Sequence, residues 1–159
     1  MNYRIILIGK LSEPFYRDGI AEYLKRLTPY GKFELITGVE QIRQPDASPG
    51  EREKTLEKEA KKLLLLIKAN EISIGLDVKG RQLTSEGFAL FLQTLNESGA
   101  SRVNFIVGSA DGLADSAKNK CDHLLSFSGM TFPHQMAVLI LTEQIYRGFR
   151  ILRGEPYHK

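Results

Sequence analysis

The sequence contains one cysteine, no tryptophan and no long hydrophobic run. A lone cysteine, Cys121, cannot form an internal disulfide, so nothing indicates an oxidising compartment. The longest apolar run after the N-terminal segment, residues 136–141, is far shorter than the roughly 20 residues that span a bilayer. Residues 1–10 lack a basic leader and a small-residue cleavage site, which favours a buried strand over a signal peptide. We therefore expect a cytoplasmic protein without a membrane partner.

Two common nucleotide-binding motifs are also missing. The sequence has neither the dinucleotide motif Gly-x-Gly-x-x-Gly nor a Gly-Lys-Ser/Thr loop, which argues against nicotinamide and ATP chemistry. Cys121 and His123 lie close together, but no second pair of ligands stands at metal-binding spacing, so we expect no metal site. The net charge of +3 permits a polyanionic partner without requiring one, because local clusters matter more than the total.

Hydrophobic periodicity predicts strands that alternate with helices. Strands are expected at residues 3–9, 33–37, 72–77, 103–107 and 123–127. Helices are expected after Pro14, over 51–69, over 84–97 and over 134–152, and a short helix is expected after residue 112. Residues 38–50 are interpreted as a loop and Lys79-Gly80 as a turn. This alternation predicts an α/β fold in one domain, 1–159, with a mostly parallel sheet of five to six strands flanked by helices.

The predicted helix over residues 51–69 combines a buried apolar stripe with many Glu and Lys residues. We interpret the charges as a solvated face with supporting i,i+4 pairs, rather than as an RNA-binding surface.

Ligands of open α/β sheets bind beyond the carboxyl ends of the strands. Three segments lie there in this sequence: the residues after Leu76, the loop 108–112, and the loop 126–133. Glycines at both ends of the second loop can let the backbone approach a ligand, although a tight turn alone would also explain them. In the third loop, small polar residues alternate with Phe127, Met130 and Phe132. These apolar side chains can wall an adenine-sized slot, or they simply end a strand before a helix.

The last predicted helix has two apolar bands. One band repeats every three or four residues and is explained by core packing; it comprises Val138, Leu141, Ile145, Phe149 and Leu152. A second band, which includes Leu139, Tyr146 and Ile151, leaves apolar surface that a twofold partner could bury.

Basic and aromatic residues gather at the C-terminus. The cluster comprises Arg147, Arg150, Arg153, Tyr157, His158 and Lys159. Arginine suits phosphate through its fork of donors, and an aromatic or histidine ring can stack on an unpaired base. The alternative is a solvated helix end with an unstructured tail. A docked tail would place the His158 imidazole where it can accept a proton near neutral pH.

Taken together, these segments resemble the ribosomal RNA large subunit methyltransferase H family of the SPOUT superfamily. The similarity covers essentially the whole chain and is weakest over residues 39–59. Its specific signals are Thr131-Phe132-Pro133-His134 and the tail Tyr157-His158. Other matching strings are Ile5–Lys10, Glu22–Leu27, Leu76-Asp77, Lys79-Gly80, Ser85–Gly87, Phe105–Gly108, Leu125–Ser128, Glu143–Arg147 and Arg153–Pro156.

The resemblance implies a C-terminal trefoil knot, a homodimer and S-adenosylmethionine as the cofactor. It implies methyl transfer to N3 of a pseudouridine in 23S rRNA, within the ribosome. The implied cofactor contacts are Leu76, Gly108, Phe127, Ser128, Gly129, Met130, Thr131 and Phe132. Two positions depart from the family pattern: Ser109 stands where members often have a second glycine, and Val138 stands where they tend to have arginine.

The hypothesis is in-line transfer of the sulfonium methyl group, with the protein orienting the reactants and removing the N3 proton. His158 is the candidate for positioning or deprotonation, Tyr157 for packing against the base, and Arg147 for a phosphate or charge contact. Arg150, Arg153 and Lys159 are candidate RNA contacts, and the tail is expected to act at the partner subunit's pocket. Two alternatives stay open: a knotted methyltransferase for another RNA such as tRNA, and a non-catalytic RNA-binding module of ribosome assembly.

Overall fold

Five parallel strands form a single sheet in the computed structural model, which describes residues 1–42 and 44–157. The strands are β1 (Asn2–Leu7), β2 (Lys32–Ile36), β3 (Glu71–Gln82), β4 (Arg102–Val107) and β5 (His123–Ser126). Their order across the sheet is β2-β1-β4-β3-β5, and each of the four pairings is parallel. The prediction of an α/β fold with a parallel sheet of this size is confirmed. The trefoil knot stays a prediction.

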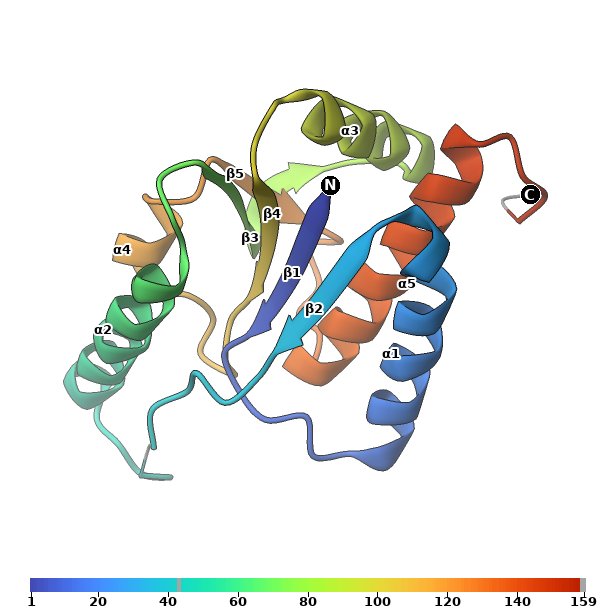
Figure 1. The fold of residues 1–159 in the computed structure, drawn as a ribbon. Coiled ribbons are helices and arrows are strands. Elements are labelled where there is room, and N and C mark those ends of the chain that lie inside the picture. Colours follow the sequence, from blue (N-terminus) through green and yellow to red (C-terminus); the bar gives the residue numbers. More distant parts are fainter. Residues whose placement is uncertain (43, 158–159) are drawn as a thin grey trace.

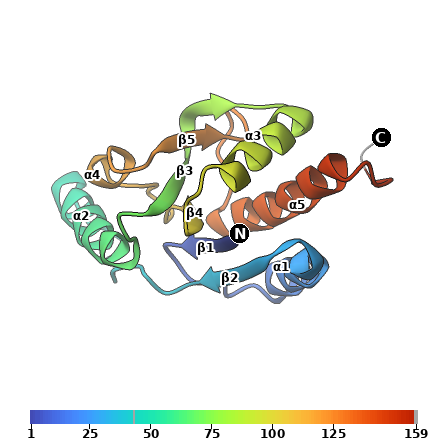
Figure 2. The ribbon, with the colours of Figure 1, turned by 45° about the horizontal axis from the view of Figure 1, so that its top comes forward.

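Helices cover both faces of the sheet (Figures 1 and 2). They are α1 (Pro14–Leu27), α2 (Pro49–Leu66), α3 (Ser85–Glu97), the short α4 (Asp115–Lys118) and α5 (His134–Leu152), and a 3-10 turn, η1 (Thr28–Tyr30), follows α1. One face carries α1, α3 and α5, and the other carries α2 and α4. Among the described residues, no helix is both long enough and apolar enough to cross a membrane.

Coverage on both faces explains why β1 is apolar along nearly its whole length. Tyr3, Ile5 and Leu7 point into the core formed with α1, α3 and α5, whereas Ile6 and Ile8 point into the core formed with α2 and α4. All five side chains are at most 1% exposed. Alternate residues of a strand face opposite sides, so a strand buried twice reads as a continuous apolar run. The predicted buried first strand is therefore confirmed.

Helix α2 begins two residues earlier than the sequence pattern suggests. The hydroxyl of Ser48 accepts a hydrogen bond from the Glu51 backbone N–H (3.3 Å), and the Glu51 carboxylate accepts one from the Ser48 N–H (2.7 Å). This reciprocal capping box leaves Pro49 in the first helical position, where its missing N–H costs nothing. The prediction of a loop through Gly50 was wrong for this reason.

Strand β3 continues beyond the turn predicted at Lys79-Gly80. Leu76 pairs with Leu125, and after a break in register Arg81 pairs with Leu125 again. A Cβ atom at Gly80 would lie 2.5 Å from the carbonyl carbon of Leu125, so the two backbones touch at this point. The glycine is required by close packing of two strands rather than by a turn. The predicted turn is therefore wrong. Residues 77–80 form an irregularity in β3 that interrupts its pairing with β5, at the end of the sheet that carries the site.

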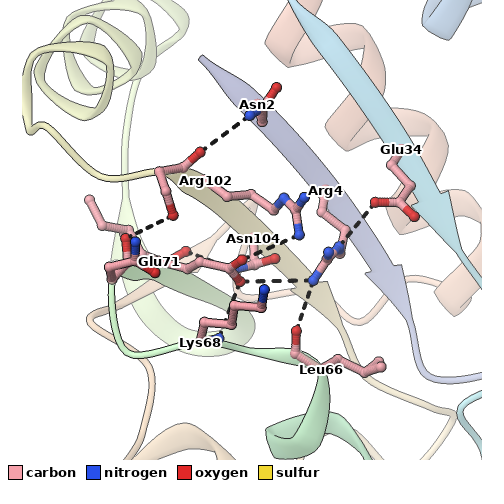
Figure 3. Close-up of polar contacts among 11 residues, drawn as sticks. Asn2, Arg4, Glu34, Leu66, Lys68, Glu71, Arg102 and Asn104 are labelled. Carbon is pink, nitrogen blue, oxygen red and sulfur yellow. Dashed lines mark hydrogen bonds and ion pairs between the residues drawn. The ribbon is translucent and has the colours of Figure 1, made fainter.

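A polar network joins four strands near their amino ends, on the face that carries α2 (Figure 3). The Glu71 carboxylate is 3.8 Å from Arg4, is 3.2 Å from Arg102, and accepts a 3.0 Å hydrogen bond from the Asn104 amide. Arg4 also donates to Glu34 on β2 (3.2 Å). These contacts hold β2, β1, β4 and β3 together at the end of the sheet opposite the carboxyl-end loops.

Tyr3 predicts how the stability of the fold depends on alkaline pH. Its hydroxyl donates a hydrogen bond to the side-chain oxygen Oδ1 of Asn96, and burial raises the pKa of Tyr3 to about 12, against the smaller lowering effect of that bond. The folded state thus keeps a proton that the unfolded chain loses near pH 10. We expect the free energy of unfolding to fall by about 2–3 kcal/mol between pH 10 and 12. Urea unfolding across this range measures the loss, and Tyr3→Phe should be flatter there; an equal slope in that variant contradicts the assignment.

Candidate functional site

A cavity of about 790 Å³ opens where β4 and β5 end and where the pairing of β3 with β5 is interrupted after Leu76. Its walls are residues 76–79 within β3, the segments that follow β4 and β5, Lys118 of α4, and the first turn of α5. In Figure 1 this end of the sheet lies toward the start of α5 and away from the end of that helix. The volume lies within the range of about 300–1,000 Å³ that is typical of small-molecule sites.

Seven of the eight predicted cofactor-binding residues line this cavity. They are Leu76, Gly108, Phe127, Ser128, Met130, Thr131 and Phe132. The eighth, Gly129, lies between two lining residues without lining the cavity itself. The structure thus brings together three loops that are separated by about 20–30 residues along the chain. A role of these residues in cofactor binding stays a prediction.

Residues 108–112 form a tight turn at the end of β4. The Gly112 N–H donates to the Ser109 carbonyl oxygen (2.8 Å), and Gly112 has a φ of 83°, which L side chains rarely adopt. A Cβ atom at Gly108 would lie 2.5 Å from the carbonyl carbon of Gly112. Both glycines are therefore required by the turn itself. The two interpretations left open for this loop are compatible, because the same turn lines the cavity.

The loop after β5 is organised by its own serines. The Ser126 hydroxyl donates to the Ser128 carbonyl oxygen (2.9 Å), and the Ser128 hydroxyl accepts from the Met130 N–H (3.0 Å). Phe127 is half-buried against the core, whereas the Met130 side chain is 73% exposed. This loop therefore combines an anchored aromatic wall with an exposed apolar side chain at the cavity mouth, as expected for a slot that takes a flat apolar group.

An ion pair that sequence reasoning missed lies in the cavity wall. Lys118 Nζ on α4 is 2.9 Å from Asp77 Oδ2, and the Lys79 N–H donates to Asp77 Oδ1 (2.9 Å). Burial raises the pKa of Asp77, but the hydrogen bonds and charges of both lysines outweigh it and hold this pKa below its ordinary value. The bond to Asp77 raises the pKa of Lys118. Asp77 follows a predicted site residue directly, but nothing in the sequence indicates that Lys118 meets it.

His134 is a second lining residue without a predicted role. It opens α5 and lines both the large cavity and a smaller one of about 280 Å³. Its ring packs on Gly9 after β1, where a Cβ atom would lie 3.1 Å from the ring carbon Cδ2. A histidine at the start of a helix usually has a structural role, and the sequence pattern offers no further signal.

The described part of the predicted C-terminal cluster lies at the other end of α5. Arg147 donates to Glu143 (Nε to Oε1, 3.0 Å) and lies 4.8 Å from the ring centre of Tyr157. The Tyr157 hydroxyl donates to the same Glu143 oxygen (3.1 Å) and lies 3.4 Å from that of Tyr23. Burial, followed by these partners, raises the pKa of Tyr157 well above its usual range. Tyr157 therefore remains protonated at neutral pH.

Two further predicted RNA contacts are held by neighbouring groups. Arg150 pairs with Glu155 (2.9 Å), and the exposed Arg153 lies 4.3 Å from the ring centre of Tyr30. Arg153 also donates to the Pro29 carbonyl oxygen (3.3 Å). These cations are thus oriented by the fold rather than freely solvated. The remaining two predicted residues, His158 and Lys159, lie outside the described residues.

No group of three or more metal-binding side chains occurs among residues 1–42 and 44–157. Burial raises the pKa of the Cys121 thiol to about 11, so this group is protonated at neutral pH. Val138, one of the two positions that depart from the family pattern, is completely buried in the core. It therefore serves packing and supplies no basic contact.

The chain is similar over its full length to named methyltransferases. A family model described as "Predicted SPOUT methyltransferase" matches residues 1–158. A protein of Syntrophomonas wolfei named ribosomal RNA large subunit methyltransferase H is 50% identical over 159 residues, and its namesake from Carboxydothermus hydrogenoformans is 45% identical; both alignments cover 100% of each chain. A protein of Methanococcus maripaludis named putative ribosomal RNA large subunit methyltransferase H is 43% identical over the same length.

Two solved structures share the fold at low sequence identity. A probable methylase family protein of Haemophilus influenzae is 15% identical with a TM-score of 0.55, over 99% of this chain and 70% of that one. A probable methyltransferase of Bordetella pertussis is 16% identical with a TM-score of 0.54, over 92% and 94%. With the full-length sequence matches, these findings show that the chain belongs to the ribosomal RNA large subunit methyltransferase H family of SPOUT methyltransferases.

Proposed function

We propose that the protein is an S-adenosylmethionine-dependent methyltransferase that modifies N3 of a pseudouridine in 23S rRNA. The observation that carries the proposal is the cavity at the carboxyl ends of the strands, which gathers seven residues implied as cofactor contacts. The names of the full-length relatives support ribosomal RNA as the substrate. Such a substrate implies work in the cytoplasm, where ribosomes are found.

The chemistry of the cavity fits S-adenosylmethionine. Phe127, Met130 and Phe132 offer apolar surface for the adenine, and the hydroxyls and backbone groups of the 126–132 loop offer hydrogen-bond partners. The glycine turn at residues 108–112 lines the cavity, and a Cβ atom at Gly108 would collide with Gly112 and open the turn. When bound, the cofactor supplies an activated methyl group on a sulfonium, so that the protein mainly has to orient the base and manage one proton.

The proton at N3 requires a nearby acceptor or charge-stabilising group. Tyr157 stays protonated at neutral pH, so it suits packing or hydrogen bonding rather than proton removal. We assign the proton acceptor or positioning role to His158, whose imidazole is suited to neutral pH. Glu143 holds Arg147 against the Tyr157 ring. Arg147 is thereby assigned to fixing the Tyr157 side chain and to offering positive charge to the RNA. Arg150, Arg153 and Lys159 are assigned to phosphate contacts.

The working enzyme is proposed to be a homodimer, because one chain separates the cavity from the tail. His134 and Ala137 line the cavity at the start of α5, whereas Tyr157 packs beside Tyr146 and Arg147 toward its other end. With 19 residues, α5 spans about 28 Å at 1.5 Å per residue. Figure 1 shows the described residues that follow α5 at the far end of that helix. A tail that acts at the cavity therefore has to come from a second copy of the chain.

Two measurements test the proposal. Calorimetry should show that wild-type protein binds S-adenosylmethionine, which a purely RNA-binding module need not do. Labelled methyl groups should appear in intact ribosomes or large subunits at least about tenfold faster than in free tRNA, with the label in a pseudouridine of 23S rRNA. Methyl transfer to tRNA alone would favour the alternative of a methyltransferase for another RNA. Absence of both S-adenosylmethionine binding and methyl transfer would contradict an enzymatic role.

A further inference from the structure

Helix α2 accepts hydrogen bonds from two serine hydroxyls, one in the wall of the large cavity and one outside it, and does not line that cavity itself. Glu59 Oε2 accepts a hydrogen bond from the Ser109 hydroxyl (3.2 Å), and Glu57 accepts one from the Ser116 hydroxyl (2.8 Å). Ser109 lies in the turn that lines the large cavity, whereas Ser116 lies in α4 and does not line it. The same chemical contact thus occurs once at the cavity and once away from it.

Glu59 has an unusual environment for a carboxylate in this chain. It is 3% exposed, and its two oxygens hold two different segments: Oε1 accepts from the Gln41 N–H (3.1 Å) and Oε2 from Ser109. Its neighbour Ala60 and Leu63 pack in the core beneath α2, which keeps the helix fixed on the sheet. A buried carboxylate with two donors is strongly held, and each donor is strongly held in return.

The Ser109 side chain is the part of the turn that Glu59 controls. The main chain of Ser109 already bonds with Gly112 across the turn (2.8 Å), which fixes the shape of the turn but not its position relative to the sheet. The hydroxyl bond to Glu59 supplies that missing constraint from the face that carries α2. Loss of the bond would leave the turn closed but free to shift, and would leave a buried carboxylate oxygen without its donor.

We propose that Glu59 is a positioning residue of the methyl-donor site, which acts through Ser109 to hold the turn 108–112 where the donor binds. The inference rests on the proposed function of the large cavity. Glu59 lines only the smaller cavity, so its effect on the donor is transmitted through Ser109 rather than by contact.

The test compares variants of both contacts by calorimetry with S-adenosylmethionine. Ser109→Ala should weaken binding about tenfold, and Glu59→Ala by at least as much, because a hydrogen bond to a charged group is lost in each. Glu59→Gln should stay within about threefold of wild type, since an amide can accept from Gln41 and donate to Ser109. The matched controls Glu57→Ala and Ser116→Ala should stay within about twofold, because their contact is away from the cavity.

Coupling separates positioning from a general loss of stability. The double variant Ser109→Ala/Glu59→Ala should bind no more weakly than Glu59→Ala alone, because both changes remove the same bond. Ser109→Ala keeps the inference testable if Glu59→Ala fails to fold, and melting curves identify that case. Equal affinities for Ser109→Ala and Ser116→Ala would overturn the inference, as would a Glu59→Ala variant with unchanged donor affinity and a lower rate of methyl transfer. Failure of wild-type protein to bind the donor would instead overturn the proposed function.

Discussion

Replacing Gly108 with alanine is expected to abolish methyl transfer and to weaken S-adenosylmethionine binding at least about 100-fold, since overpacking of this size costs several kcal/mol. The new Cβ atom would lie 2.5 Å from the Gly112 carbonyl carbon and 2.6 Å from its oxygen. Both are backbone atoms, so no side-chain rotation can relieve the contact. The turn has to open, and it then moves out of the wall of the cavity. Calorimetry measures the binding, and labelled-methyl incorporation measures the transfer.

Gly50→Ala is the matched control for this change. It makes the same substitution in α2, away from the cavity, and a Cβ atom there would meet nothing within 4 Å. Donor affinity within about threefold of wild type is expected, because no packed atom has to move. If Gly108→Ala bound the donor as well as Gly50→Ala does, the turn would have no part in the site. A melting curve shows whether either variant is unfolded.

His158→Ala is expected to reduce methyl transfer by about 100-fold or more, the range typical of a lost general base or acid, while donor affinity stays unchanged. The proposed role of His158 is in proton removal or base positioning, so its loss should affect the chemical step and not cofactor binding. Single-turnover rates with ribosomes and calorimetry with the donor measure the two quantities separately. Wild-type rates in this variant would exclude a catalytic role for His158.

Mixed dimers test whether the tail acts at the partner's cavity. Gly108→Ala has a damaged cavity and an intact tail, whereas His158→Ala has an intact cavity and a damaged tail. Random mixing should restore about a quarter of the wild-type rate, because half of the dimers are mixed and each of these has one complete site of two. If the tail acts within its own chain, the mixture should remain as inactive as its parents. Co-expression with two different affinity tags isolates the mixed species.

Much of the fold follows from patterns that are local in the sequence. The apolar run of β1 and the helical stripe of α5 report burial directly, and α5 spans the residues that its periodicity predicts. The candidate cavity could be expected because parallel strands bring their carboxyl-end loops to one edge of the sheet. The methyl donor itself came from resemblance to a family and not from spacing or composition.

Contacts between distant segments could not be read from the sequence. Lys118 meets Asp77 only because α4 and the end of β3 are placed together by the strand order β4-β3-β5. Glu59 sits in a helix whose many charges are otherwise solvated, and its burial depends on the turn after β4. Gly80 could be explained in two ways from the sequence, because glycine occurs both in turns and where two strands pack closely. The turn was predicted, and the close contact with β5 is what the structure has.

The polar contacts of Glu71 favour the native order of strands in the sheet. Along the chain, β2 separates β1 from β3 and β4, and a parallel sheet could form with these strands in another order. Only the native order places Glu71 beside Arg4, Arg102 and Asn104 together. A sheet with another strand order would leave the buried Glu71 carboxylate without its ion-pair partners, which costs about 3–5 kcal/mol. The ion pairs at the amino ends of the strands thereby determine which three segments meet at the opposite end of the sheet, where the cavity lies.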